Sequence, residues 1–246
     1  MLISAMVGID SRATMDIDTT LRNYPLNCES AEQIVRQIAD VEIDDKISFV
    51  IKKTEEIMED SEYQGVRLSL DAYLDKTRIP LKIDISTGDV ITPCEISFSY
   101  QLMFENRTIP LLAYPPETVL AEKLETILSR GEANTRLRDF YDVYILQRED
   151  FVVTPDALCH ALLATCRKRG HEDLLHTYAS ILDRVRQSGT MRTQWMKYQS
   201  DFDYAAGISW DTVVDTVETL CMKTLDDHAF GDELPQEELQ FEMHLL

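Results

Sequence analysis

Cysteine pairs, basic charge and long apolar runs are all scarce in this sequence of 246 residues. Its 5 cysteines include no Cys-x-x-Cys pair, which argues against both structural zinc and a disulfide framework. Only 8 glycines and 8 prolines occur, which excludes collagen-like and low-complexity chains. No apolar run approaches the roughly 20 residues that cross a bilayer, and the apolar start lacks a basic region. We therefore expect a reduced, cytoplasmic protein that has no membrane contact.

Basic residues number 24 against 44 acidic ones, so the formal net charge is −20. Non-specific nucleic-acid binding depends on Lys and Arg, which displace counterions from phosphates. Any contact with a polyanion therefore requires a local basic patch or a bound cation. The hydrophobic share of 44% is enough for one large domain or two modest ones.

The first half of the chain has the patterns of a mixed α and β fold. A helix is predicted at about 30–40, begun by a capping box of Ser30 and Gln33. Alternation of apolar and polar residues predicts antiparallel, hairpin-linked strands at 47–52, 66–73, 79–86 and 96–102.

The second half has helical periodicity. A helix is predicted from Pro115 to Arg130, with Gly131 as its C-cap, and another begins at Leu137. Four more helices are predicted at 155–169, 172–187, 190–200 and 209–225. The fold class is therefore α+β, with a mixed sheet and helices at 1–110, a helical region at 111–225 and an acidic tail at 226–246.

Two aspartates near the start form the most informative short pattern, Asp16-Ile17-Asp18. In an extended segment, residues i and i+2 share a face about 7 Å apart. Two such carboxylates repel each other unless they are protonated or bridged by a cation, and Mg²⁺ prefers such oxygen ligands. Asp84, on the polar face of an alternating strand, is the best third metal ligand.

The same aspartates also permit other interpretations. In an acidic chain this triplet arises easily by chance, and Asp84 then lies on a solvated strand face. The run from Asp16 to Thr20 also fits the D-x-D-x-T pattern of haloacid-dehalogenase-type phosphatases. That fold needs a buried apolar strand directly before the first Asp, which residues 11–15 do not supply.

Three motifs then follow in order along the chain. They are RATMDID from Arg12 to Asp18, AYPPETVLAEKLE from Ala113 to Glu125 and RGEANTRLRDFYD from Arg130 to Asp142. With these motifs, the chain from Met1 to about Gln147 resembles the AbiEii/AbiGii nucleotidyltransferase toxin family. This family supplies the toxin of type IV toxin–antitoxin and abortive-infection phage-defence systems.

The resemblance implies a nucleotidyltransferase-type (polymerase-β-like) fold and a Mg²⁺-dependent reaction. A nucleoside monophosphate would pass from an NTP to a hydroxyl of RNA, such as a tRNA 3′ end, or of a protein, and a cognate antitoxin would be a partner. A tRNA acceptor needs local basic residues, for which residues 167–169 with Arg184, Arg186 and Arg192 are available. A solvated face is the simpler interpretation of that cluster.

The resemblance also implies roles for individual residues. Asp16 and Asp18 match the metal-binding pair, and Lys123 matches a lysine suited to holding triphosphate oxygens. Asp139 matches an aspartate that would activate the acceptor hydroxyl or orient Lys123 or Arg136. The residues expected to contact the nucleotide are Ser4, Arg12, Thr14, Lys123 and Arg136.

One family feature is absent from this sequence. Members carry a Gly-Gly pair whose position would fall immediately before Met1, where backbone N–H groups approach phosphate. We favour a start internal to a longer protein over a shortened, catalytically weakened copy. The second explanation leads to the alternative function, a non-catalytic remnant that binds a nucleotide or a partner.

Overall fold

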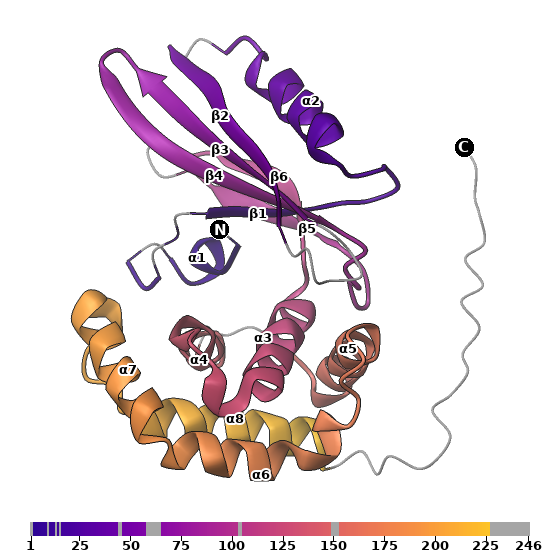
Figure 1. Ribbon diagram of the computed structural model, residues 1–246, viewed down its shortest axis with the longest axis vertical. Helices are drawn as coiled ribbons and strands as arrows, with labels where there is room; N and C mark the ends of the chain where they lie inside the picture. The colour runs from indigo at the N-terminus through magenta and orange to yellow at the C-terminus, as the bar shows by residue number, and fades with distance from the viewer. Residues whose placement is uncertain are drawn as a thin grey trace.

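The computed structural model describes residues 2–8, 10–12, 14, 16–43, 46–57, 65–102, 105–148 and 153–226. A sheet with one covering helix lies at one end of the molecule and a body of helices at the other (Figure 1). The short helix α1 (Leu2–Val7) lies between them. The predicted α+β class is confirmed.

Four strands form the main sheet. Their order across the sheet is β1 (Asp16–Leu21), β4 (Thr77–Thr87), β3 (Gly65–Leu74) and β2 (Ile47–Ile57). β2, β3 and β4 pair antiparallel as predicted, whereas β1 runs parallel to β4.

A separate two-stranded sheet consists of β5 (Ile96–Gln101) and β6 (Thr108–Ala113). The first of these strands was predicted and the second was not. Pro110 lies in the middle of β6 and has no N–H to donate. A two-stranded sheet tolerates it because each strand has an open edge.

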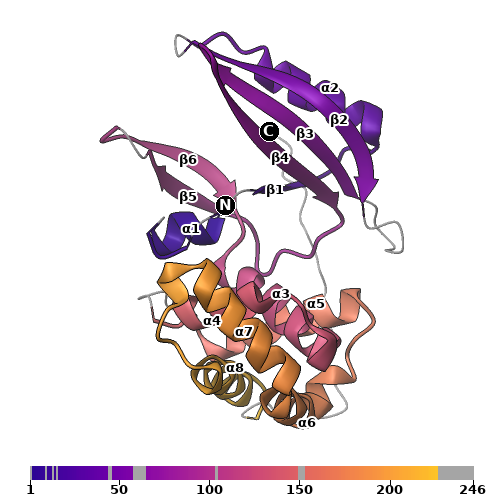
Figure 2. The ribbon, with the colours of Figure 1, turned by 60° about the vertical axis from the view of Figure 1, so that its left-hand side comes forward.

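Helix α2 (Cys28–Ala39) covers one face of the main sheet (Figure 2). Its Ala31 and Val35 pack in one core with β3 residues such as Leu68. The predicted capping box of Ser30 and Gln33 is wrong. Asn27 is the N-cap instead, and its side chain accepts from the Ser30 N–H while the Ser30 hydroxyl accepts from the Asn27 N–H.

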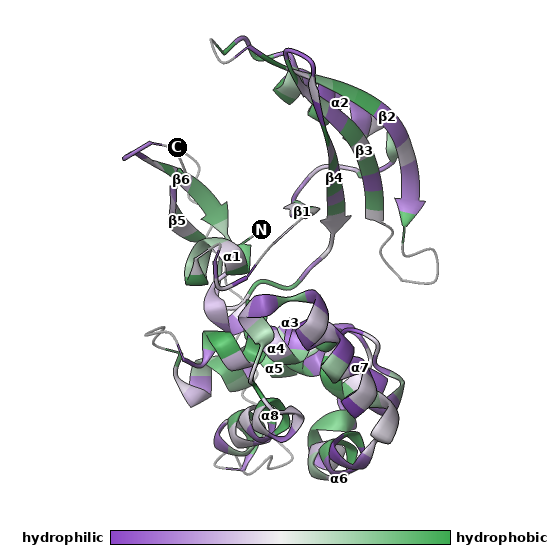
Figure 3. Ribbon diagram, turned by 90° about the vertical axis from the view of Figure 1, so that its left-hand side faces the viewer, coloured by the Kyte–Doolittle hydropathy of each residue, from purple (hydrophilic) through white to green (hydrophobic). Residues whose placement is uncertain are grey.

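The strand period places polar residues on the other face of the sheet. Leu81, Ile83 and Ile85 of β4 pack toward the α2 core, so Asp84 lies on the opposite face. Bands of hydrophobic and hydrophilic residues follow one another along β3 (Figure 3). Asp18 of β1 is in register with Asp84 and therefore shares this polar face.

Six helices and two short 3₁₀ turns form the rest of the described chain. They are α3 (Pro116–Arg130), η1 (Gly131–Ala133), α4 (Leu137–Leu146), α5 (Pro155–Lys168), α6 (Leu174–Gln187), α7 (Gly189–Asp201), η2 (Asp203–Ala205) and α8 (Trp210–Leu225). Five of the six were predicted to within about two residues at each end, including the Gly131 C-cap of α3, and the predicted start of α4 at Leu137 is confirmed.

The helical body has a core distinct from that of the sheet. Leu124 of α3, Phe140 of α4 and Val214 of α8 are fully buried in it. Ile3 and Val7 of α1 belong to the same core, so the first helix packs with the second half of the chain. No helix in the described part of the chain combines the length and apolarity needed to cross a bilayer.

Candidate active site

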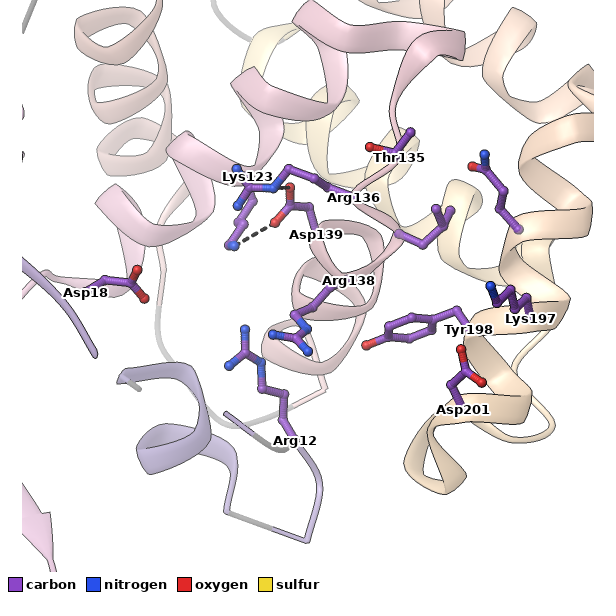
Figure 4. A pocket seen from close by; sticks show the side chains of 12 residues that line it. Arg12, Asp18, Lys123, Thr135, Arg136, Arg138, Asp139, Lys197, Tyr198 and Asp201 are labelled. Carbon is purple, nitrogen blue, oxygen red and sulfur yellow. Dashed lines mark hydrogen bonds and ion pairs between the residues drawn. The ribbon is translucent and has the colours of Figure 1, made fainter. Parts of the chain in front are cut away.

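A pocket of about 550 Å³ lies between β1 and the helical body. It is lined by Arg12, Asp18, Lys123, Thr135, Arg136, Leu137, Arg138, Asp139, Gln194, Lys197, Tyr198 and Asp201. Figure 4 shows Asp18 on one side, Lys123 and Asp139 in the middle, and Tyr198 and Lys197 on the opposite side. Five of these side chains are cations and three are carboxylates, so the pocket is locally positive in a strongly acidic chain.

Lys123 is held at the pocket by two buried carboxylates. Its Nζ donates to Asp139 Oδ1 at 2.6 Å and lies 3.2 Å from Asp142 Oδ2. The Arg136 Nε lies 3.0 Å from the other oxygen of Asp139. Asp139 is 1% exposed, whereas half of the Arg136 side chain is accessible. The arrangement orients the lysine and leaves the arginine reachable from solvent.

Asp142 connects this lysine to Arg12 near the N-terminus. Arg12 Nε and Nη2 donate to the two oxygens of Asp142 at 3.0 and 3.2 Å. Asp142 is 0% exposed and Arg12 is 6% exposed. Burial alone would lower the pKa of Arg12, but the facing carboxylate raises it, so the guanidinium stays charged.

Asp142 was not among the predicted site residues, although the third motif contains it. It follows Asp139 by three positions on α4, so the two carboxylates lie on one helix face. That spacing was the available signal. What sequence reasoning lacked was the position of Arg12, which the fold brings to α4 from 130 residues away in the chain.

The connected ionic groups carry an excess of positive charge. Arg136, Asp139, Lys123, Asp142 and Arg12 form one continuous chain of contacts. It contains three cations and two carboxylates. The carboxylates are buried beneath the cations, so the unbalanced charge is positive and adjoins the pocket.

The predicted metal ligands are placed by β1 and β4. Asp18 is exposed on β1 and lines the pocket. Asp16 begins β1, and its side chain lies outside the described residues. Asp84 is beside Asp18 in register, and Arg67 donates to its two oxygens at 2.7 and 2.6 Å. Among the described side chains, no three His, Cys, Asp or Glu residues form a metal-binding group.

Two other predicted contacts lie away from the pocket. Ser4 is buried in α1 and accepts from Arg12 Nη1 at 3.4 Å. Thr14 is half-buried between two residues outside the described part of the chain. Ser4 and Thr14 both belong to the described part of the chain, and neither side chain lines the pocket. Ser4 thus contacts a pocket residue and lies behind it.

The far wall of the pocket carries cations from α4 and α7. Arg138 lies over the Phe202 ring, 5.6 Å from its centroid, and Lys197 lies beside Tyr198 (Figure 4). Burial raises the pKa of the Tyr198 phenol, so it stays protonated. Neither Arg138 nor Lys197 has an ion-pair partner among the described residues.

In contrast, the arginines of the predicted basic cluster, at 167–169 and at positions 184, 186 and 192, form ion pairs with acidic residues. The ion pairs are Arg167–Glu172, Arg169–Glu122, Arg169–Glu125, Arg184–Glu132, Arg186–Asp215, Arg186–Glu218 and Arg192–Asp211. These contacts favour the simpler interpretation, a solvated face.

The described residues give the phosphatase alternative no support. Its pattern requires a buried apolar strand that runs into the first aspartate, and residues 13 and 15, on which this depends, lie outside the described part of the chain; β1 is described from Asp16 to Leu21. The Thr20 hydroxyl donates to Asp89 at 2.6 Å and lies beside Tyr114, within contacts that join the sheet to the end of β6.

Comparison with known proteins supplies the family. Two solved structures are similar: a proposed nucleotidyltransferase from H. pylori and JHP933 from Helicobacter pylori. Each is 13% identical with a TM-score of 0.43. The alignments cover 93% and 92% of this chain and 87% and 84% of the other chains. No curated protein matches the chain.

A family model, the nucleotidyl transferase AbiEii toxin of type IV toxin–antitoxin systems, matches residues 1–216. The match includes all three motifs and every helix and strand that lines the pocket. The chain therefore belongs to the AbiEii nucleotidyltransferase toxin family.

Proposed function

We propose that this pocket binds an NTP together with Mg²⁺ and transfers the nucleoside monophosphate to an acceptor hydroxyl. The observation that carries the proposal is the position of Lys123. Two buried carboxylates hold it in the same pocket as Asp18, in the middle of the cavity between Asp18 and Tyr198 (Figure 4).

Lys123 and Arg136 are suited to holding the triphosphate. An ammonium group is a compact charge for phosphate oxygens, and a guanidinium presents paired donors. Asp139 contacts both side chains, so the two donors are aligned before any nucleotide binds. Arg12 adds positive charge from beneath and, being buried, acts chiefly by holding Asp142 in place.

Asp16 and Asp18 would hold the metal ion. They are two residues apart on β1, and the exposed Asp18 lines the locally positive pocket, so a metal ion held there would also be within reach of phosphate oxygens of a bound nucleotide. Bound Mg²⁺ supplies stabilisation of the negative charge on the phosphate oxygens. We retain Asp84 as a third ligand, which requires Arg67 to release one of its two oxygens.

In the proposed reaction, the acceptor oxygen forms a bond to the α-phosphorus. The bond from that phosphorus to the α,β-bridging oxygen breaks, pyrophosphate leaves and the hydroxyl proton passes to water. Asp139 is almost fully buried, with a cation beside each oxygen. These contacts favour the orienting role for Asp139 over removal of the acceptor proton.

The far wall of the pocket favours a phosphate-bearing acceptor, namely RNA such as a tRNA 3′ end. Arg138 and Lys197 place two cations beyond the proposed triphosphate site, where an RNA backbone would approach. Tyr198 adds an aromatic ring beside them. The family further supports a cognate antitoxin as a partner.

Label transfer tests the proposal. The protein is incubated with Mg²⁺, total RNA and each NTP carrying label at either the α- or the γ-phosphate. We expect the α-label and not the γ-label to enter RNA. Lys123→Ala and Asp18→Asn should abolish transfer, while Lys76→Ala in the distant β3–β4 turn serves as the matched control.

Other outcomes of this assay would contradict parts of the proposal. Transfer that survives Asp18→Asn or Lys123→Ala would remove those residues from the site. Label on protein instead of RNA would reject the RNA acceptor. NTP binding without any transfer would instead favour the non-catalytic remnant.

A further inference from the structure

The outer edge of the main sheet carries a feature that the proposed reaction does not use. β2 ends the strand order, so no strand in the described part of the chain pairs with its outer side. α2 covers one face of the sheet near β2, and the strand lies at its outer border (Figures 2 and 3). At residues 53–57 this edge presents backbone donors and acceptors that no strand in the described part of the chain pairs with.

Two positive residues precede Thr54 on this strand, and two negative residues follow it. Residues 52–56 read Lys-Lys-Thr-Glu-Glu, with Thr54 at the centre. A second copy of the strand that pairs antiparallel about Thr54 places Lys53 opposite Glu55 of the other copy, and Glu55 opposite Lys53. Lys52 is the extra residue of the bulge between Ile51 and Lys53, so it takes no regular place in this pairing. Opposite charges across a strand pair stabilise it, and like charges destabilise it.

Only one antiparallel register places opposite charges against each other. Two identical strands that continue a sheet are related by an axis perpendicular to it, so paired residues lie on the same face. Centring the pair on Lys53 brings lysine against lysine, and centring it on Glu55 brings glutamate against glutamate. Centring it on Thr54 brings Lys53 of each copy against Glu55 of the other.

The side-chain directions in β2 agree with that register. Lys53 and Glu55 lie opposite Ser69 and Arg67 of β3, which puts both on the polar face. They already contact each other within one chain, with Lys53 Nζ 2.5 Å from Glu55 Oε2. Thr54 points to the other face, where its hydroxyl donates to Glu32 of α2. Regular pairing with β3 resumes at Lys53 after the bulge at Lys52, so Lys53, Thr54 and Glu55 lie in a regular stretch of the edge.

We propose that β2 is a self-association edge, on which a second copy of this chain pairs antiparallel about Thr54. The occupant is a second copy because the charge pattern is complementary to itself. Overall, a chain of net charge −20 repels its own copies, so an edge on which two lysines and two glutamates balance each other is where they can meet. The dimer has one continuous eight-stranded sheet.

This interface leaves the pocket open. β2 and β1 lie at opposite borders of the sheet, three strand spacings or about 14 Å apart. Dimer formation is therefore independent of whether the transferase activity is as proposed.

Charge reversal tests the proposal, with mass measured by sedimentation velocity up to high-micromolar concentration. The wild type should dimerise. Lys53→Glu places glutamates against Glu55 of the other copy, and Glu55→Lys places lysines against Lys53. Each single variant should raise the dissociation constant at least about tenfold. The double variant K53E/E55K restores opposite charges and should restore the dimer.

Mixing the two single variants provides the most discriminating test of the register. Neither should dimerise alone, yet together they should form a heterodimer, because each lysine then faces a glutamate. Thermal melts of every variant establish that the monomer is folded, which is expected for exposed positions. A wild type that stays monomeric, single variants that dimerise normally or a double variant without recovery would overturn the proposal.

Discussion

Replacing Asp142 by asparagine tests whether the buried ionic chain is built as described. The substitution keeps the shape of the side chain and removes its charge, so Arg12 is left as a 6% exposed cation without its counter-charge. Breaking a buried pair in this way costs about 3–5 kcal/mol in the free energy of unfolding. For a chain of this size, that corresponds to a fall in Tm of about 6–20 °C.

Urea denaturation and thermal melts measure the effect. The matched control is Glu172→Gln, which removes the carboxylate of the exposed Arg167–Glu172 pair and should change stability by less than about 1 kcal/mol. The double variant Arg12→Met/Asp142→Leu replaces both charges with apolar groups and should recover much of the loss. A loss below about 1 kcal/mol for Asp142→Asn would refute the assignment of Asp142 as the buried link.

Three further predictions concern single residues. Lys123→Ala should abolish label transfer while leaving the far-ultraviolet circular dichroism spectrum unchanged, and an active variant or an altered spectrum would contradict this. Burial raises the pKa of Glu122 to about 7 despite Arg169 nearby. Since this pKa exceeds its ordinary 4.5, the stability that Glu122 contributes is complete below about pH 4.5 and is lost as the pH rises through about 7. Tm should therefore fall between about pH 4.5 and pH 7 and level off above that range, and Glu122→Gln should flatten the fall. A slope of Tm against pH that the substitution leaves unchanged would count against the raised pKa. Asn27→Ala should lower the unfolding free energy by about 1 kcal/mol in urea titrations, because it removes the side-chain cap of α2; no change would mean that the cap contributes nothing.

The helical half was predictable because its signals are local. Apolar stripes, Pro116 in the first turn and Gly131 after the last all occur within one helix length of the residues they organise. The same is true of β2, β3 and β4, whose alternation of apolar and polar residues is local and whose β3–β4 connection is a two-residue turn. The prediction failed at Pro110 and Asn27, where a single residue departs from the expected pattern without breaking the element.

The site was harder to predict because it depends on contacts between distant parts of the chain. Lys123, Arg136 and Asp139 come from one contiguous region, and the motifs identified them. Arg12 reaches α4 only because α1 packs into the helical core through Ile3 and Val7. Neither composition nor periodicity contains that information, which is why Asp142 was overlooked.

The parallel pairing of β1 with β4 is the second non-local element. It sets Asp18 beside Asp84 and directs Asp18 into the pocket. The choice of Asp84 as a third metal ligand already assumed that it comes from a strand beside Asp18. The sequence pattern did not indicate that the two strands pair parallel or that Asp18 and Asp84 are in register. It also did not reveal Arg67, whose alternation in β3 places it on the same face as Asp84.

A crystal structure of the protein with Mg²⁺ and a non-hydrolysable NTP analogue tests the central claim most directly. We predict that the β- and γ-phosphates contact Lys123 Nζ and the Arg136 guanidinium. The metal ion should lie on the carboxylates of Asp16 and Asp18. A triphosphate bound elsewhere, with Lys123 still held only by Asp139 and Asp142, would contradict the account.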